Sequence, residues 1–402
     1  MEGYLILSDG TIYQGISFGA ETDQITEGEV VFNTGLTGFQ ELLTDPSYCG
    51  QIVTLTYPLV GNYGINTVDN ESDRIQVKAL VVRGAAHKPN HWQLAMSLPE
   101  FLKSQHIIGL EGIDTRALTR KIRNHGTMNG VICTGFRSEE ELQVLVNKAR
   151  ETQGWEGQDL TALVSTSTPY VIHYSSVHGQ IEDPFLEADL VESITPEYME
   201  SLDKLTSQGI YRVVVIDYGV KRNILRSLFA LGCEVVVVPK HFSATEILEF
   251  KPSGILLSNG PGDPKDVVGA QETVQELIQQ GIPLLGICLG HQILALALGG
   301  DTVKLKFGHR GGNHPVKNPE ENKVYITSQN HGYVVVKDSL EPETFEIIAV
   351  NANDGTIEGF KHKTLPIMSI QYHPEGNPGP DDTGYHFGEF FQAMHKYYSE
   401  QI

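Results

Sequence analysis

Two stretches in the C-terminal half of the chain carry residue types that could perform nucleophilic chemistry. In the first, Cys288 lies two residues after Gly286 and two residues before Gly290, in the run GICLG. A nucleophile flanked in this way, at a turn from strand to helix, is the nucleophile-elbow pattern, here with cysteine in the place of serine. The following helix would direct its N-terminus at the sulfur and favour the thiolate. The alternative is a buried cysteine that serves as a small apolar side chain.

The second stretch is the end of an apolar segment, LPIMSIQYHPEG at residues 365–376. His373 and Glu375 stand two residues apart, so a strand would project them to the same face. A thiol of ordinary pKa, about 8.5, is only a few per cent ionised at neutral pH and needs a base. The carboxylate would orient the imidazole, which would take the thiol proton and later return it to a leaving amine.

Two loops could complete such a site. The loop 258–264 (SNGPGDP) is rich in glycine and proline. Its backbone N–H groups, with that of Leu289 directly after the cysteine, are candidates for an oxyanion hole. A plain Pro-Gly turn is the alternative. The polar turn 329–333 (QNHGY) could recognise a substrate through backbone and amide groups, although a single histidine such as His331 is more often structural.

The elements around these residues predict a parallel sheet. From Tyr211 onward, short apolar segments alternate with amphipathic ones. We expect strands at 212–217, 232–238, 254–257 and 282–287, and helices at 221–231, 243–250 and 267–280. This alternation is typical of a doubly wound, mostly parallel α/β sheet, whose functional loops gather at the carboxyl ends of the strands. We assign this domain to residues 209–402.

The first 150 residues have a different pattern, which predicts a mixed α+β domain over 1–150. We expect a hairpin at 4–15, strands at 28–33, 51–57, 79–83 and 130–134, and helices at 90–104 and 114–123. Asp114 is expected to cap its helix rather than to form an acid/base pair with Arg116. The segment 33–48 is denser in glycine, threonine and asparagine than a hairpin needs, but the residues alone do not establish a functional loop there.

Residues 151–208 are predicted to be an acidic connection between the two domains. There is no lysine or arginine between Arg150 and Lys204. Acidic side chains crowd the second half of this segment, namely Glu182, Asp183, Glu187, Asp189, Glu192, Glu197, Glu200 and Asp203. Such a change in charge marks a domain boundary. The segment 170–174 is expected to add a strand to a neighbouring sheet.

The composition bounds the class of protein. At 402 residues, with 40% apolar and 20% charged residues, the chain can fill two domain cores. Its 50 acidic and 29 basic residues give a net charge of −21, which argues against nucleic acid or an anionic membrane as partner. The four cysteines form no CxxC pair, and His309 and His314 lack accompanying ligands, so we expect neither disulfides nor a metal site. The N-terminus has no signal-peptide pattern and no stretch could span a bilayer, so we expect a cytoplasmic location.

Three motifs together resemble the class I (triad) glutamine amidotransferases: GICLGHQ at 286–292, SNGPGDP at 258–264 and YHPE at 372–375. Three segments of the first domain, at 28–41, 44–48 and 112–119, are similar to the small subunit of carbamoyl phosphate synthetase. The resemblance covers nearly the whole chain and leaves only the acidic connection without distinctive motifs.

The resemblance implies glutamine hydrolysis through a thioester on Cys288, with His373 as acid and base and Glu375 as the group that orients it. It also implies residues that hold the substrate. These are Gly260 and Leu289 as oxyanion donors, and Ser47, Gly262, Gln292, Asn330, Gly332 and Tyr333 around the glutamine. Relatives often have phenylalanine where this chain has Tyr333, but the role expected there is a backbone contact.

The resemblance further implies a partner: a large subunit that uses ATP, Mg and bicarbonate to make carbamoyl phosphate for arginine and pyrimidine biosynthesis. This chain has no GxxxxGK[ST] loop, so we expect no cofactor in it and expect ATP on the large subunit of a heterodimer. Weak activity is expected of the isolated chain, because unshared ammonia would be waste.

Two other functions compete with this one. The glutaminase of another amidotransferase, such as one making anthranilate or guanylate, is disfavoured by the first domain. A catalytically inactive regulatory homologue is disfavoured because Cys288, His373 and Glu375 are all retained.

Overall fold

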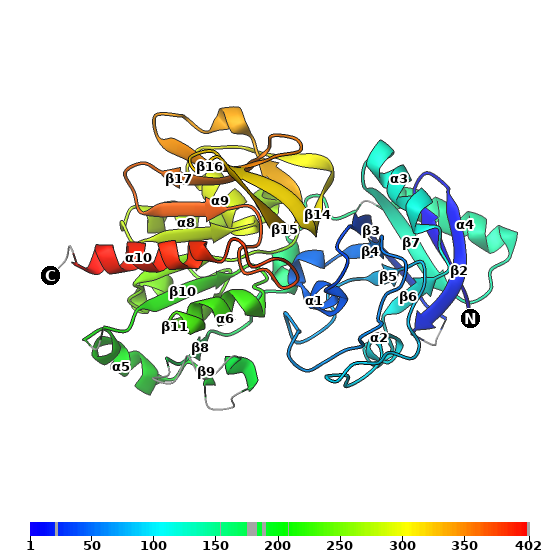
Figure 1. Cartoon of the computed structure of the whole chain (residues 1–402), viewed down its shortest axis with the longest axis horizontal. Helices are drawn as coiled ribbons and strands as arrows, with labels where there is room; N and C mark the ends of the chain where they lie inside the picture. The colour runs from blue at the N-terminus through cyan, green and yellow to red at the C-terminus, as the bar shows by residue number, and fades with distance from the viewer. Residues whose placement is uncertain (21–22, 153, 175–182, 187–189, 208, 400–402) are drawn as a thin grey trace. The chain divides into compact units, whose positions relative to one another are not determined.

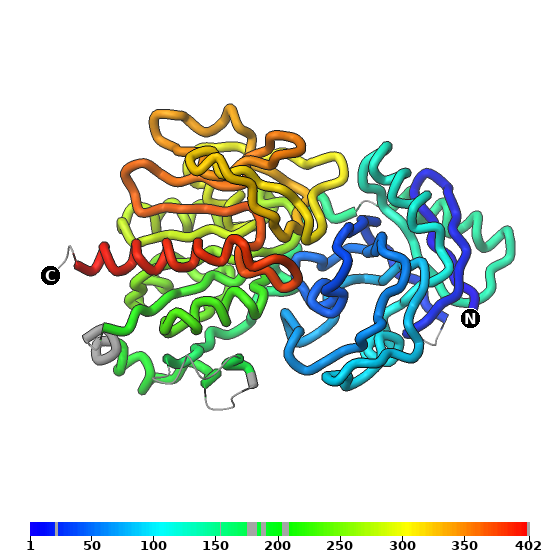
Figure 2. The backbone as a smooth tube through the Cα atoms, viewed as in Figure 1, coloured from blue at the N-terminus to red at the C-terminus, as the bar shows by residue number. Residues whose placement is uncertain are grey.

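The structure, a computed structural model, describes residues 1–20, 23–152, 154–174, 183–186, 190–207 and 209–399 (Figure 2). Of the acidic connection, Glu182, Glu187 and Asp189 lie outside the described residues, and Asp203 is described by its backbone alone. The contacts divide the chain into two units, one of residues 1–158 with 305–313 and one of residues 159–304 with 314–402. The expected domain boundaries at 1–150, 151–208 and 209–402 stay a prediction.

The first unit contains a closed barrel of seven strands in the order β1-β2-β6-β5-β4-β3-β7 (Figure 1). The strands are β1 (Glu2–Leu7), β2 (Ile12–Gly19), β3 (Ile25–Asn33), β4 (Gln51–Leu55), β5 (Ala79–Val81), β6 (Ile108–Glu111) and β7 (Met128–Thr134). Its helices are α1 (Phe39–Thr44), η1 (Pro46–Tyr48), α2 (Leu98–Ser104), α3 (Thr115–His125) and α4 (Glu139–Glu151). The pairs β3–β4, β4–β5 and β5–β6 are parallel, while β1 pairs antiparallel with β2 and β7. The mixed α+β character is thus confirmed.

The helix expected at 90–104 is wrong in its first half. Helix α2 begins at Leu98, because the Ser97 side chain accepts a hydrogen bond from the backbone N–H of Glu100 and the Glu100 carboxylate accepts one from Ser97. This reciprocal capping box satisfies the free N–H groups of a first turn and fixes the start of the helix. The Asp114 side chain caps α3 by accepting from the N–H of Ala117, as expected.

The second unit is built on a sheet of eleven strands in the order β15-β14-β16-β17-β18-β13-β12-β10-β11-β8-β9. Its strands are β8 (Tyr170–Ile172), β9 (Val191–Ser193), β10 (Arg212–Asp217), β11 (Glu234–Pro239), β12 (Gly254–Leu257), β13 (Leu284–Ile287), β14 (Thr302–Asn318), β15 (Lys323–Val335), β16 (Phe345–Asn351), β17 (Ile357–His362) and β18 (Ile367–Ile370). The run β18-β13-β12-β10-β11 is parallel. Strands β8 and β17 extend it antiparallel on either side. The α/β class and the parallel core of this sheet are confirmed, as is the strand near 170–174. The expectation of a mostly parallel sheet is wrong for the whole sheet, because its outer strands pair antiparallel and make it mixed.

Helices cover both faces of this sheet, as the alternation predicted. They are α5 (Pro196–Ser207), α6 (Arg222–Ala230), α7 (Ala244–Glu249), α8 (Ala270–Ile278), α9 (Leu289–Ala297) and α10 (Tyr385–Ser399), with short turns η2 (Leu160–Leu163), η4 (Pro184–Leu186), η5 (Pro264–Asp266) and η6 (Lys337–Ser339). Apolar side chains of α6 and α10 pack in one core on one face, and those of α7, α8 and α9 pack in another on the opposite face (Figure 1). Within the described part of the chain, no helix has both the length and the apolar character that a membrane crossing requires.

The strand order explains how distant motifs come together. Strand β13 lies between β12 and β18, and all three run parallel. The residues that follow them in the chain are the loop 258–264, Cys288 and His373. Because carboxyl ends of parallel strands meet at one edge of a sheet, the three motifs share that edge.

Candidate active site

Cys288 occupies the turn between β13 and α9 in a conformation that side chains rarely adopt. Its φ is 55° and its ψ is −104°. A non-glycine residue in such a region costs on the order of 1–3 kcal/mol and persists only where its surroundings impose it. Here its N–H donates to the carbonyl of Ile370 at 2.8 Å, and the N–H of Gly290 donates to that of Ser258 at 3.0 Å. The turn is therefore fixed to both neighbouring strands.

The two glycines around Cys288 are required by close backbone packing. A methyl group at Gly290 would lie 2.1 Å from the carbonyl oxygen of Leu257, and one at Gly286 would lie 2.7 Å from that of Gly290. Both distances are shorter than any normal contact, so only glycine fits. The close packing at these two glycines allows the start of α9 to lie against β12 and β13.

His373 and Glu375 form a buried pair just beyond β18. The imidazole Nδ1 lies 2.7 Å from Oε1 of Glu375, and His373 is 2% exposed. The His373 backbone is fixed as well, since its N–H donates to the carbonyl of Ser328 at 2.9 Å. The spacing of two residues thus gives the contact that the sequence predicts.

The other ring nitrogen of His373, Nε2, is left for the cysteine. Among the described residues it makes no hydrogen bond of standard length and angle. Burial alone would lower the pKa of His373, but the Glu375 carboxylate and the nearby Cys288 sulfur outweigh burial and raise it. The site therefore favours the imidazolium form of His373, a cation that can stabilise a cysteine nucleophile beside it.

Lys221 is a further side chain of the candidate site, and its place there was not expected from the sequence. Its Nζ lies 2.9 Å from Oε1 of Glu375 and donates to the carbonyl of Gly376 at 2.7 Å, with the lysine only 2% exposed. Burial would raise the pKa of Glu375, but Lys221 and His373 together lower it. Asn223 adds a hydrogen bond from Nδ2 to the carbonyl of Glu375 at 2.5 Å. Its position in the sequence could have indicated this, because Lys221 follows β10 and therefore lies at the edge of the sheet where the strands' carboxyl ends meet.

The two expected oxyanion donors pack against each other. A methyl group at Gly260 would lie 2.2 Å from the carbonyl oxygen of Tyr218 and 2.8 Å from a side-chain carbon of Leu289. The first N–H groups of a helix have no partner within it, and Leu289 opens α9. Gly262, in the same loop, has a φ of 92°, which favours glycine. The loop 258–264 is therefore a packed wall beside the nucleophile.

The side-chain amide of Gln292 is held in one orientation by two hydrogen bonds. Its Nε2 donates to the carbonyl of Tyr333 at 2.8 Å and to Oε1 of Gln371 at 3.0 Å. Both amide hydrogens are used in this way, so the amide orientation is fixed and Oε1 stays available as an acceptor. An acceptor at this place suits the ammonium or amide N–H of an amino-acid substrate.

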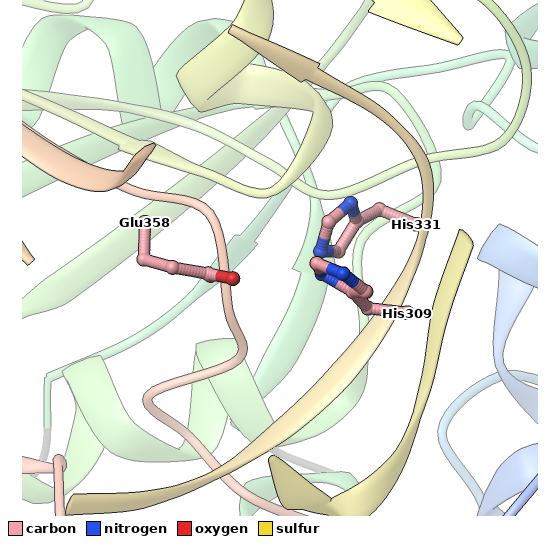
Figure 3. Close-up of side chains that lie close together, drawn as sticks. All are labelled: His309, His331 and Glu358. Atoms are coloured by element: carbon pink, nitrogen blue, oxygen red, sulfur yellow. The ribbon is translucent and has the colours of Figure 1, made fainter. Parts of the chain in front are cut away.

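The turn expected at 329–333 is wrong, because Asn330, Gly332 and Tyr333 lie within strand β15, where a buried polar network holds them. The Cys288 sulfur lies 3.7 Å from the carbonyl of Asn330, which brings this part of β15 to the cysteine. His331 binds the carbonyl of Tyr333 through Nδ1 at 2.8 Å and Oε1 of Gln329 through Nε2 at 2.7 Å. Gln329 in turn donates to Glu358 at 2.9 Å, and Figure 3 shows His331 and Glu358 on their strands. The side chain of His331 thus supports this part of β15.

Ser47, the remaining expected residue, belongs to the first unit. It lies in η1, 4% exposed, and its N–H donates to Oδ1 of Asp45 at 2.9 Å. Asp45 caps this turn, and Pro46 sets its first dihedral angle. The expectation that Ser47 reaches the glutamine stays a prediction.

Two family models match the chain. Residues 214–393 match the model described as "Glutamine amidotransferase class-I", and residues 5–132 match "Carbamoyl-phosphate synthase small chain, CPSase domain".

Similar proteins span nearly the whole chain. A carbamoyl phosphate synthase small chain of Syntrophotalea carbinolica is 46% identical over 98% of this chain and 98% of its own length. One of a Nostoc species is 48% identical over 98% and 95%. The pyrimidine-specific small chain of Bacillus subtilis is 45% identical over 98% and 96%. Among solved structures, a putative GMP synthase protein of Thermoplasma acidophilum is 27% identical over 48% of this chain and 98% of its own, with a TM-score of 0.42.

Proposed function

The chain belongs to the carbamoyl phosphate synthase small-chain family and acts as its glutamine-hydrolysing amidotransferase subunit, and we propose that Cys288, His373 and Glu375 carry out the hydrolysis. The observation that supports this assignment best is the environment of the two ring nitrogens of His373. One ring nitrogen is fixed by Glu375 at 2.7 Å, and the other is left for a cysteine on a constrained elbow.

The first half of the reaction forms a thioester and releases ammonia. His373 takes the thiol proton, and the Cys288 sulfur attacks the side-chain carboxamide carbon of glutamine. The carbonyl oxygen becomes an oxyanion, which the backbone N–H groups of Gly260 and Leu289 would stabilise. When the tetrahedral intermediate collapses, the C–N bond breaks, and His373 returns its proton to the nitrogen, so that ammonia leaves.

The second half regenerates the thiol. A water molecule gives a proton to His373 as its oxygen attacks the thioester carbon, the C–S bond breaks, and glutamate leaves. The proton then returns from His373 to the sulfur. Throughout both halves Glu375 orients the imidazole and stabilises its positive charge without taking the proton. Gln292 and residues 330–333 of β15 would hold the amino-acid end of the substrate.

We propose that the ammonia is used by a large subunit, as the family's small-chain designation suggests. ATP, Mg and bicarbonate would bind that subunit, which would make carbamoyl phosphate for arginine and pyrimidine synthesis. This chain would need no cofactor of its own. The cysteine usage of the sequence supports a cytoplasmic location for the pair.

Glutamine hydrolysis by the chain and its Cys288→Ser variant tests the mechanism. The variant is expected to lose on the order of 10³-fold or more in kcat, because a neutral hydroxyl replaces the thiolate. Mass spectrometry of quenched wild-type protein should find a glutamyl adduct on Cys288. Equal hydrolysis by both proteins would overturn the assignment of the nucleophile. Cys233→Ser is the matched control, since this cysteine is also buried but lies near the start of β11.

A further inference from the structure

A second buried histidine, His386, is hydrogen-bonded to the residue that precedes the catalytic histidine in the chain. Tyr372 precedes His373, is 2% exposed, and its hydroxyl lies 2.7 Å from Nε2 of His386. Nδ1 of His386 lies 2.8 Å from Oε2 of Glu389. The other oxygen of Glu389 accepts a hydrogen bond from Nζ of Lys361 at 3.0 Å. Four side chains thus form one continuous chain of hydrogen bonds.

The chemistry of these groups fixes the direction of each hydrogen bond. Burial would raise the pKa of Glu389, but His386 and Lys361 outweigh it and lower the pKa, so Glu389 is an acceptor. Nδ1 of His386 must then carry the hydrogen of the contact with Glu389, while Nε2 faces the Tyr372 hydroxyl. Burial raises the pKa of Tyr372, so its hydroxyl keeps its proton and donates it to Nε2.

This chain of hydrogen bonds joins three elements at the point where β18 ends. Lys361 comes from β17, His386 and Glu389 come from the first turns of α10, and Tyr372 lies two residues beyond β18. The Tyr385 ring packs on the His386 ring with 4.2 Å between centroids. Both ring nitrogens of His386 take part in this chain of hydrogen bonds.

The same backbone segment carries the catalytic base. Tyr372 and His373 are consecutive residues just beyond β18, and their side chains contact different partners. The imidazole of His373 is held by Glu375, and the Tyr372 hydroxyl is held by His386. Between them, the N–H of His373 donates to Ser328 at 2.9 Å. Any rotation of this segment would move both side chains together.

We propose that Tyr372 and His386 are positioning residues that set the orientation of His373 toward the Cys288 sulfur. The inference rests on the proposed function, because it concerns the geometry of the same base. Neither residue contacts the reacting atoms. Their role is to prevent the strand end from rotating, which matters because a displacement of about 1 Å in a catalytic group can cost on the order of 100-fold in rate.

The test is glutamine hydrolysis by Tyr372→Phe, measured as kcat and KM separately. Phenylalanine keeps the ring and the packing and removes only the hydroxyl. We expect kcat to fall about tenfold, since His373 would be held from one side only, while KM changes less than about twofold. His386→Gln keeps an amide acceptor for the tyrosine and should retain more activity than His386→Leu, which keeps none.

The same helix offers a matched control. The Tyr211 hydroxyl lies 2.7 Å from Nδ1 of His395, also on α10, but Tyr211 immediately precedes β10, away from the carboxyl ends of the strands. Tyr211→Phe removes the same kind of hydrogen bond and should leave kcat unchanged. Thermal unfolding of all variants shows whether a loss of rate accompanies a loss of folded protein.

Three results would overturn the proposal. The first is an unchanged kcat in Tyr372→Phe. The second is an equal fall of kcat in Tyr211→Phe, and the third is a rise of KM alone. If instead the wild-type chain showed no hydrolysis dependent on Cys288, the proposed function itself would fail, and the two failures are therefore distinguishable.

Discussion

At the scale of single residues, the site depends on buried charges that compensate each other. Glu375 is 6% exposed and contacts two cationic groups, Lys221 at 2.9 Å and His373 at 2.7 Å. Transfer of an unpaired carboxylate from water to such a place would be very costly. The orientation of the base is therefore inseparable from the lysine beside its carboxylate.

Replacing Lys221 with glutamine should affect stability and catalysis together. It leaves Glu375 with one cation fewer, and breaking a buried pair from one side typically costs about 3 kcal/mol. Urea unfolding should show this loss, and kcat for glutamine should fall because Glu375 no longer holds His373 firmly. Lys265→Gln, which breaks the exposed contact with Asp301, is the control and should leave both quantities nearly unchanged. An equally stable Lys221→Gln protein would contradict the account.

His291 provides a prediction of pH dependence. It is fully buried in α9, its Nδ1 lies 2.8 Å from the Ser369 hydroxyl, and burial lowers its pKa to about 3. The unfolded chain binds a proton near pH 6.5 and the folded chain does not, so stability falls as the pH drops below 6.5. Between pH 7 and pH 5 this residue alone should cost about 2 kcal/mol.

The measurement is urea unfolding of the wild type and His291→Asn at both pH values. The variant should lose about 2 kcal/mol less than the wild type over this interval. His241→Asn, at an exposed histidine, is the control. This variant should lose the same unfolding free energy between pH 7 and pH 5 as the wild type. Parallel losses in the wild type and His291→Asn would show that His291 already binds a proton in the folded state.

At the scale of elements, the strand-turn-helix unit of β13 and α9 determines where the nucleophile lies. Gly290→Ala should disrupt it, because the added methyl group would meet the Leu257 carbonyl at 2.1 Å, and the backbone of β12 cannot yield easily. We expect a loss of about 3 kcal/mol in unfolding free energy, together with most of the glutaminase activity.

A glycine on α10 serves as the control for that substitution. A methyl group at Gly388 would meet no atom within 4 Å, and alanine favours a helix over glycine. Gly388→Ala should therefore be neutral or stabilise the protein by up to about 1 kcal/mol. If Gly290→Ala were as stable and active as Gly388→Ala, close packing would not be the reason for the elbow glycines.

The parallel core of the second unit was predictable from the sequence, whereas in the first unit most strands were predictable but their arrangement in a barrel was not. Strands 212–217 and 254–257 are continuous apolar runs bounded by turn residues, and local pattern was enough to find them. The barrel depends on β3, β4, β5 and β6 pairing in parallel, and such pairings between distant segments leave no local signal. The segment 90–97 was misread as helix because its apolar residues have a helical spacing, although the cap at Ser97 decides the true start.

Site residues divide in the same way. His373 and Glu375 were found because their contact lies within three residues of sequence. Lys221 is 154 positions from Glu375, and only the parallel order of the strands brings the two together. The Tyr372–His386 contact joins residues 14 positions apart. Hydrophobic periodicity can place His386 in a helix, but it cannot indicate which side chain His386 contacts.

At the scale of the whole molecule, the chain combines two folding units. The middle of β14, residues 305–313, belongs to the first unit although the rest of the strand belongs to the second. Phe307 stacks on Phe32 at 5.8 Å, and the N–H of Thr34 donates to the carbonyl of Arg310 at 3.1 Å. Hydrophobic periodicity could not reveal this, because the alternation along a strand does not show in which unit each part of the strand packs.

A glutaminase that supplies a partner should be slow when alone. We expect glutamate release by the isolated chain to rise at least tenfold when the large subunit, ATP and bicarbonate are all present, a coupling of roughly 1.4 kcal/mol or more. Steady-state glutamate release with each component omitted in turn measures it. Full activity of the isolated chain would show that the partner does not control this site.

Nitrogen transfer in the reconstituted complex tests the central claim most directly. Carbamoyl phosphate synthesis is measured for complexes that contain the wild-type chain or Cys288→Ser, with either glutamine or ammonia as the nitrogen source. The account predicts that Cys288→Ser abolishes synthesis from glutamine and leaves synthesis from ammonia intact. Synthesis from glutamine by the Cys288→Ser complex at the wild-type rate would contradict it.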